Sequence, residues 1–168
     1  MSKKLLIISA TSRNNLELAQ QIDNITSSLN IEKDLINLEE YDIPLYTTIK
    51  QEDTIPKHVN DITLKFIDAS GFIFCAPEYN AGIPPILTNA ITWISVSTKN
   101  WRDVFKNKKA LIASHSGSGA HAFLSSFQAQ LEYMGCTVYH RKISVHRNAE
   151  FNPESVDRIL SNFKTFFK

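Results

Sequence analysis

The sequence from Gly71 to Gly82 reads GFIFCAPEYNAG. Its first six residues are small or apolar and predict a strand over 71–76 that is buried on both faces. The rest forms a turn, and a helix is predicted over 83–96, where Pro84 and Pro85 are tolerated only in the first turn. A buried strand that leads through a loop into a helix is the unit from which parallel α/β sheets are built.

The same unit recurs along the chain. Strands are predicted over 5–9, 33–38, 110–114 and 136–145, and helices over 14–29, 59–69, 120–134 and 153–167. Gly135 is expected to end one helix and Asn152 to cap another, whereas the polar stretch 46–56 is expected to be a flexible loop. The alternation predicts a single α/β domain over residues 1–168. Its expected architecture is a flavodoxin-like three-layer sandwich with a five-stranded parallel sheet in the order 2-1-3-4-5.

The composition excludes several classes of function. The chain has 168 residues, 43% hydrophobic and 21% charged, with a net charge of +1, so nothing in its charge points to nucleic acid or an anionic membrane. Cys75 and Cys136 lie in apolar surroundings and are predicted to be buried, reduced thiols. The apolar run after Lys4 is too short for a secretory leader or a membrane span. We therefore expect a cytoplasmic protein that binds neither nucleic acid nor membrane.

Sheets of this type bind ligands outside the carboxyl ends of their strands, which makes the loops after strands one, three and four the candidate site. The first loop reads SATSRNN over 9–15. Thr11 and Ser12 offer hydroxyl donors, Arg13 offers a planar cation, and free amides at the helix start favour a phosphate. A polar turn capped by Asn14 or Asn15 is the alternative. The loop lacks the glycines of a Walker A or GxGxxG motif.

The second loop carries the most specific motif. The chain has Pro77-Glu78-Tyr79-Asn80, then Ile83-Pro84, and then Asn89-Ala90-Ile91-Thr92-Trp93 in the next helix. This pattern resembles the NAD(P)H-dependent FMN reductase family, which includes quinone, chromate and azo-dye reductases. The family has Asp where this chain has Thr92, Gly-Ser-x-Arg where it has Ala10-Thr11-Ser12-Arg13, and often a phosphate-binding Ser at the position of Leu16.

The resemblance implies an oxidoreductase that passes hydride from NAD(P)H through bound FMN to a small-molecule electron acceptor. The acceptor would be a quinone, an azo or nitro compound, a metal oxyanion or a free flavin. No catalytic side chain and no metal are expected, because the cofactor supplies the chemistry. A homodimer or homotetramer is also implied. The implied cofactor-binding residues come from all three loops: Thr11, Ser12, Arg13, Asn15 and Leu16; Pro77, Glu78, Tyr79 and Asn80; and Ser114, His115, Ser116 and Gly117.

The flavin ring explains why such loops would be useful. Backbone amides of residues 78–80 would bind its polar edge, and Tyr79 would form an aromatic wall, with core packing as the alternative for Tyr79. Gly82 is expected to permit a positive φ or a close backbone approach. The third loop, SHSGSG over 114–119, would contact the ring or serve only as a glycine-rich link. It contains no GxSxG motif, and its histidines lack metal-ligand spacing.

Three other functions remain open from the sequence. A flavodoxin-type electron carrier shares the fold, but such carriers are strongly acidic, whereas this chain carries a net charge of +1 and Arg13 in its first loop. A non-catalytic flavin-binding module is the second alternative. A protein that binds a different nucleotide is the third, because a fold does not determine a function.

Overall fold

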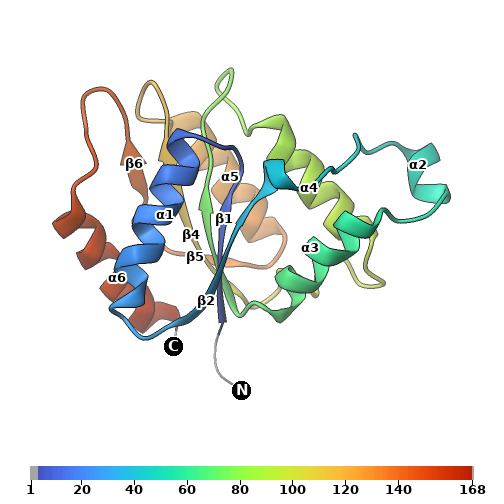
Figure 1. Cartoon of the computed structure of the whole chain (residues 1–168), viewed down its shortest axis with the longest axis horizontal. Helices are drawn as coiled ribbons and strands as arrows, with labels where there is room; N and C mark the ends of the chain where they lie inside the picture. Colours follow the sequence, from blue (N-terminus) through green and yellow to red (C-terminus); the bar gives the residue numbers. More distant parts are fainter. Residues whose placement is uncertain (1–3, 168) are drawn as a thin grey trace.

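The computed structural model of the chain describes residues 4–167, and it places one sheet between two layers of helices (Figure 1). The strands are β1 (Lys4–Ser9), β2 (Glu32–Asn37), β3 (Gly71–Cys75), β4 (Lys109–His115), β5 (Thr137–Val138) and β6 (Ile143–Val145). The helices are α1 (Asn14–Ser27), α2 (Thr48–Glu52), α3 (Lys57–Asp68), α4 (Pro85–Val96), α5 (His121–Tyr133) and α6 (Pro153–Phe167), with a 3-10 turn η1 (Leu38–Glu40) after β2.

All paired strands run parallel, in the order β2-β1-β3-β4-β5, which confirms the predicted sandwich. The predicted fifth strand over 136–145 is wrong in one respect, because it is broken into β5 and β6, and both pair with β4. Val138 lies opposite Ala110 and Ile143 opposite Ala113. Between these two pairs, the segment that joins β5 to β6 has more residues than β4 has. The extra residues leave the hydrogen-bond ladder.

Alternating side chains of the central strands fill two separate cores. Leu6, Ile8, Phe72 and Phe74 belong to the core under α3, α4 and α5. The intervening residues of the same strands, such as Ile73, belong to the core under α1 and α6. Because each strand is covered on both faces, its sequence is apolar throughout, as the continuous runs predicted.

The helix ends follow the predicted signals in most places. Gly135, which follows the C-cap residue Met134 of α5, has φ 98°. Asn152 accepts the backbone N–H of Ser155 at 2.9 Å as the cap of α6. Pro85 opens α4. The alternative of an Asn14 or Asn15 cap for α1 is wrong, because Arg13 occupies the cap position and makes no side-chain cap bond. Where a flexible loop over 46–56 was predicted, the structure has the short helix α2, which buries none of its residues.

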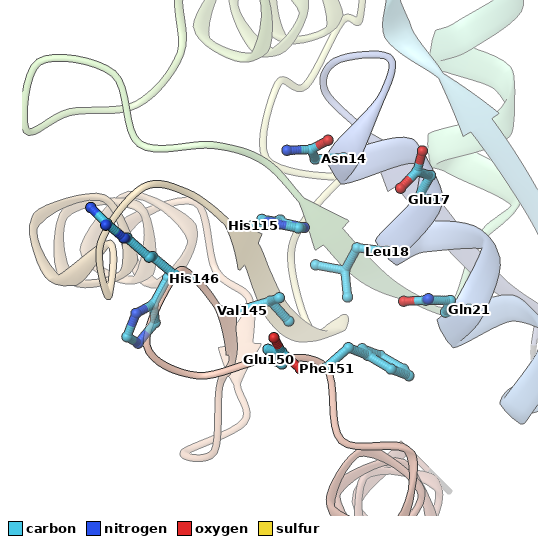
Figure 2. A pocket seen from close by; sticks show the side chains of 10 residues that line it. Asn14, Glu17, Leu18, Gln21, His115, Val145, His146, Glu150 and Phe151 are labelled. Atoms are coloured by element: carbon cyan, nitrogen blue, oxygen red, sulfur yellow. The ribbon is translucent and has the colours of Figure 1, made fainter.

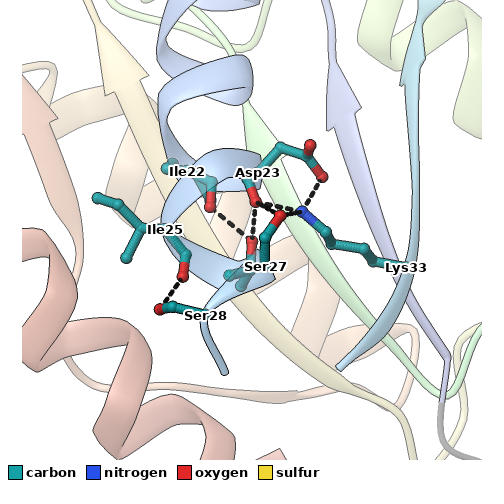
Figure 3. A network of polar contacts seen from close by, with 7 residues as sticks. Ile22, Asp23, Ile25, Ser27, Ser28 and Lys33 are labelled. Atoms are coloured by element: carbon teal, nitrogen blue, oxygen red, sulfur yellow. Dashed lines mark hydrogen bonds and ion pairs between the residues drawn. The ribbon is translucent and has the colours of Figure 1, made fainter. Parts of the chain in front are cut away.

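A lysine joins β2 to the helix that precedes it (Figure 3). The ammonium of Lys33 lies 2.5 Å from the carboxylate of Asp23 and 2.8 Å from the hydroxyl of Ser27, and it also donates to the backbone carbonyl of Asp23. Three acceptors on the last turns of α1 thus satisfy the three ammonium protons. This contact ties the start of β2 to the last turns of α1.

The segment 41–47 is fastened to α4 by two side chains one helical turn apart. The indole N–H of Trp93 donates to the carbonyl of Pro44 at 2.7 Å. Asn89 donates to the same carbonyl at 3.0 Å and accepts the backbone N–H of Tyr46 at 2.8 Å. Thr92 turns its hydroxyl back to the carbonyl of Thr88. The Asn-x-x-x-Trp pattern in α4 therefore has a structural role in this chain.

Replacing Phe72 by alanine tests the larger core. The ring is fully buried against Phe66, Phe74 and Phe105, with ring centroids 5.2, 5.5 and 5.9 Å away. We expect Phe72→Ala to lower the free energy of unfolding by about 3–5 kcal/mol, measured by urea denaturation. Leu64→Ala on the exposed face of α3 should change it by less than about 0.5 kcal/mol. Equal effects of the two changes would contradict this assignment of the core.

Candidate functional site

The three predicted loops leave the sheet side by side. The ladder continues past the strand ends, because Ala10 donates its N–H to Cys75 at 2.8 Å and Ala76 donates to Ala113 at 3.1 Å. Ser116 likewise donates to Val145 at 3.0 Å. These bonds hold the starts of all three loops at the carboxyl edge of the sheet, which is where open sheets bind ligands.

One cavity of about 600 Å³ joins the three loops. Most of the predicted cofactor-binding residues line it: Thr11, Ser12, Arg13, Asn15, Pro77, Glu78, Tyr79, His115, Ser116 and Gly117. Three predicted residues are not among the lining. Leu16 is half-buried on α1, Asn80 is exposed at a turn, and Ser114 is buried. Asn14 and Glu39 line the cavity without having been predicted.

The first loop keeps its donors on the cavity side. Arg13 has φ 62° and ψ −127°, a conformation that glycine favours, and it lies immediately before α1. The first helical bond is donated by Glu17 to the carbonyl of Arg13, so the amides of residues 14–16 precede the helical ladder. Within residues 4–167, Arg13 makes no ion pair with a carboxylate. A cation and several amides are thus available to an anion.

Asn15 locks the first loop to the third. Its side-chain amide donates to the carbonyl of His115 at 3.0 Å, and its side-chain oxygen accepts the N–H of His115 at 2.9 Å. The Asn15 side chain is buried, so this pair replaces water at both backbone groups of His115. The amide is therefore already engaged within the protein. Direct contact between Asn15 and a phosphate stays a prediction.

The second loop is a tight hairpin turn. Tyr79 and Gly82 exchange backbone bonds of 3.3 and 3.0 Å around Asn80 and Ala81, whose φ values are 51° and 55°. Two central residues with positive φ match a type I′ turn. The expected positive φ at Gly82 is wrong, since the positive φ values fall on the two residues before it. A Cβ at Gly82 would meet only ordinary contacts within the protein, and a close approach by a ligand stays a prediction. Tyr79 is 51% exposed at the cavity, which excludes core packing for its ring.

Glu78 connects the second loop to the third and to α5. Its backbone N–H donates to the hydroxyl of Ser116 at 2.8 Å, and that hydroxyl lies 2.9 Å from the hydroxyl of Ser114. Its carboxylate accepts the N–H of Phe123 in the first turn of α5 at 2.9 Å. A carboxylate at a helix start is favourable because it faces the positive end of the helix dipole. The amides of Glu78 and Tyr79 are thus both engaged, the latter with the carbonyl of Gly82, and of the predicted amides of residues 78–80 only that of Asn80 has no hydrogen-bond partner among the described residues.

Glu39 enters the site from η1, after β2. Its carboxylate accepts the backbone N–H of Ser12 at 2.8 Å. Asn37 donates to the hydroxyl of Ser12 at 3.0 Å, so that hydroxyl keeps its own proton for another acceptor. The loop after strand two could have been included from the sequence, because in the predicted order strand two lies beside strand one. The Glu39 carboxylate therefore occupies one backbone donor of the first loop, the N–H of Ser12.

A second cavity of about 340 Å³ adjoins the first and shares Asn14 and His115 with it. Figure 2 shows side chains of α1, including Leu18, facing the segment that follows β6. Its lining mixes carboxylates with Arg147 and two histidines. This mixture favours no single charge class of ligand.

The clearest shifted ionisations lie away from the loops. Burial raises the pKa of Cys136 to about 12 and also raises the pKa of Cys75, and both are buried free thiols, as predicted. Burial lowers the pKa of Lys108 to about 8, and its ammonium donates to the last carbonyls of α3.

Among residues 4–167, no group of three or more His, Cys, Asp or Glu side chains is arranged to hold a metal. No helix in the described part of the chain is long and apolar enough to cross a membrane.

Fold and site together define a flavodoxin-like protein that presents a loop with a cation and unpaired amides beside an aromatic turn at the edge of its sheet. Residues 3–150 match the family described as NADPH-dependent FMN reductase, and the chain belongs to that family. The resemblance to this family is thereby confirmed.

Two curated relatives match parts of the chain. The NADH-dependent flavin reductase subunit 2 of Lactobacillus johnsonii is 34% identical over 80 residues, which cover 48% of this chain and 44% of that protein. The quinone reductase of Escherichia coli K12 is 40% identical over 55 residues, which cover 32% of this chain and 29% of that protein. The chain thus spans less than half the length of either relative.

A solved structure extends the likeness to nearly the whole chain. The flavoenzyme NAD(P)H:(acceptor) oxidoreductase FerB from Paracoccus denitrificans superposes with a TM-score of 0.75 at 20% identity. The superposition covers 98% of this chain and 94% of that one. At this identity the likeness concerns the fold.

Removing the side chain of Asn15 tests the lock between the loops. Asn15→Ala leaves the N–H and carbonyl of His115 without these partners, so we expect a loss of about 1–3 kcal/mol in the free energy of unfolding. Urea denaturation followed by tryptophan fluorescence measures the loss. Asn14→Ala is the matched control and should change stability by less than about 0.5 kcal/mol. An Asn15→Ala protein as stable as the control would show that the lock contributes nothing.

Proposed function

We propose that this chain binds FMN in the cavity between the three loops and works as an NAD(P)H-dependent reductase. The observation that carries the proposal is the single cavity that joins an anion-accepting loop to an aromatic turn. The phosphate would lie against Thr11, Ser12, Arg13 and the first amides of α1, and the ring against Tyr79 and the third loop. FMN would supply the acceptance and onward transfer of hydride.

The residues present suit that group. Ser12 has a hydroxyl proton to donate, and Arg13 is free of carboxylate partners within residues 4–167. Gly117 has nothing within 4 Å of where a Cβ would lie, so the backbone of the third loop can be approached closely. The Asn15–His115 pair and the Ser116–Glu78 bond hold the loops in place before a ligand arrives, which lowers the entropy lost on binding.

The acceptor we propose is a quinone or a free flavin, because the two curated relatives are named as a quinone reductase and a flavin reductase. Azo and nitro compounds and metal oxyanions are further candidates. Both nicotinamides are candidate donors, because the family is described as NADPH-dependent and the flavin reductase relative is named NADH-dependent. We also propose that residues 1–168 act as one cytoplasmic domain.

Self-association into a homodimer or homotetramer is a further part of the proposal. Its support is a set of large apolar side chains that are at least half exposed, among them Leu45, Ile49, Ile67 and Tyr133. Large exposed apolar side chains are typical of contact surfaces when they lie close together. Light scattering coupled to gel filtration would give the mass directly.

The visible spectrum of the purified protein tests the function. We expect flavin absorption bands, or their appearance after addition of FMN, then loss of the bands with NAD(P)H and their return with a quinone. A protein that takes up no FMN would contradict the proposal. A protein whose flavin is reduced only by a separate reductase would instead be an electron carrier.

Arg13 provides a test at the level of one residue. Arg13→Ala should weaken FMN binding by about 1.5–3 kcal/mol, because a hydrogen bond to a charged group is lost. Arg13→Lys should lose less, since it keeps the charge but not the planar guanidinium. Quenching of flavin fluorescence measures both. Arg102→Ala, which removes a guanidinium stacked on Trp101 away from the cavity, is the control and should bind FMN normally. Unchanged affinity in Arg13→Ala would mean that Arg13 points elsewhere.

A further inference from the structure

The 3-10 turn η1 is docked on the first loop by two hydrogen bonds. Ser12 donates its N–H to the carboxylate of Glu39 at 2.8 Å, and Asn37 donates to the hydroxyl of Ser12 at 3.0 Å. Asn37 also accepts the N–H of Glu39 at 3.2 Å, so a single asparagine orients the turn toward the loop. The Glu39 carboxylate thereby uses one of the backbone donors that an anion in this loop would need.

The charges around the cavity indicate that the contact between Glu39 and Ser12 affects the binding of an anion. Among the side chains that line it, Arg13 is positive, whereas Glu39 and Glu78 are negative. The carboxylate of Glu78 is held at the start of α5 by Phe123. The carboxylate of Glu39 is the one seated on the first loop, where it offsets the attraction of Arg13 for an anion. Like charges brought together at a binding site reduce affinity.

We propose that Glu39 is a specificity-determining residue that competes with the phosphate of the flavin for the backbone N–H of Ser12. This inference rests on the proposed FMN site. A phosphate-bearing flavin must displace the carboxylate from Ser12 or accept its repulsion, whereas a flavin without phosphate meets neither cost. Glu39 therefore lowers the preference for FMN over riboflavin and leaves the bound flavin easier to exchange.

The test compares two flavins in two matched variants. Glu39→Gln removes the charge and keeps an oxygen that can accept the N–H of Ser12. We expect its dissociation constant for FMN to fall about fivefold, a size typical of an exposed charge interaction, while that for riboflavin changes less than about twofold. Both constants come from flavin fluorescence titrations at constant ionic strength, because screening alters the charge term.

Glu40→Gln is the control, since it removes the same charge one residue away. Glu40 does not line the cavity and only accepts a bond of 3.4 Å from Asn37, so both flavins should bind as they do to the unaltered protein. Weaker or unchanged FMN binding in Glu39→Gln, or an equal gain for riboflavin, would overturn the inference while leaving the FMN site intact. If neither flavin binds any of the three proteins, the proposed function fails and this inference fails with it.

Discussion

Burial of both faces of the central strands is the constraint on which the rest of the structure depends. In β1, Leu5 and Ile7 face one core while Leu6 and Ile8 face the other, so helices must cover the sheet on both sides. Helical crossovers between neighbouring strands force those strands to run parallel. Parallel strands in turn bring the segments after β1, β3 and β4 to one edge, and the cavity lies where those segments separate.

The polar residues at this edge of the sheet form two groups with different roles. Asn15, Ser116 and the carboxylate of Glu78 form their hydrogen bonds with backbone groups of other segments, two in loops and one at the start of α5. What remains directed at the cavity is Arg13, hydroxyl protons and free amides. A family motif can therefore mark residues that hold the loops in place, as well as residues that touch a ligand. Asn89 and Trp93 in α4 also belong to the family motif, and they hold the segment 41–47 through hydrogen bonds.

The regular elements were largely predictable because each carries a local signal. Continuous apolar runs marked β1, β3 and β4, and Gly135 and Asn152 marked helix ends through their own backbone or side-chain geometry. The break between β5 and β6 was missed, since it depends on how an edge strand matches the register of β4. Gly82 was misjudged for a similar reason. The type I′ turn places its positive φ values on Asn80 and Ala81. The composition of the loop does not distinguish this turn from one with a positive φ at Gly82.

The amino-acid sequence by itself determined the layered α/β architecture and the loops that form the candidate site, because hydrophobic periodicity and turn residues act over a few neighbours. Only the tertiary structure decided which polar groups in those loops are already engaged. It paired Asn15 with His115 and placed Glu39 on Ser12. These partners come from different strand ends, and hydrogen bonding at that range depends on three-dimensional approach, which no local pattern records.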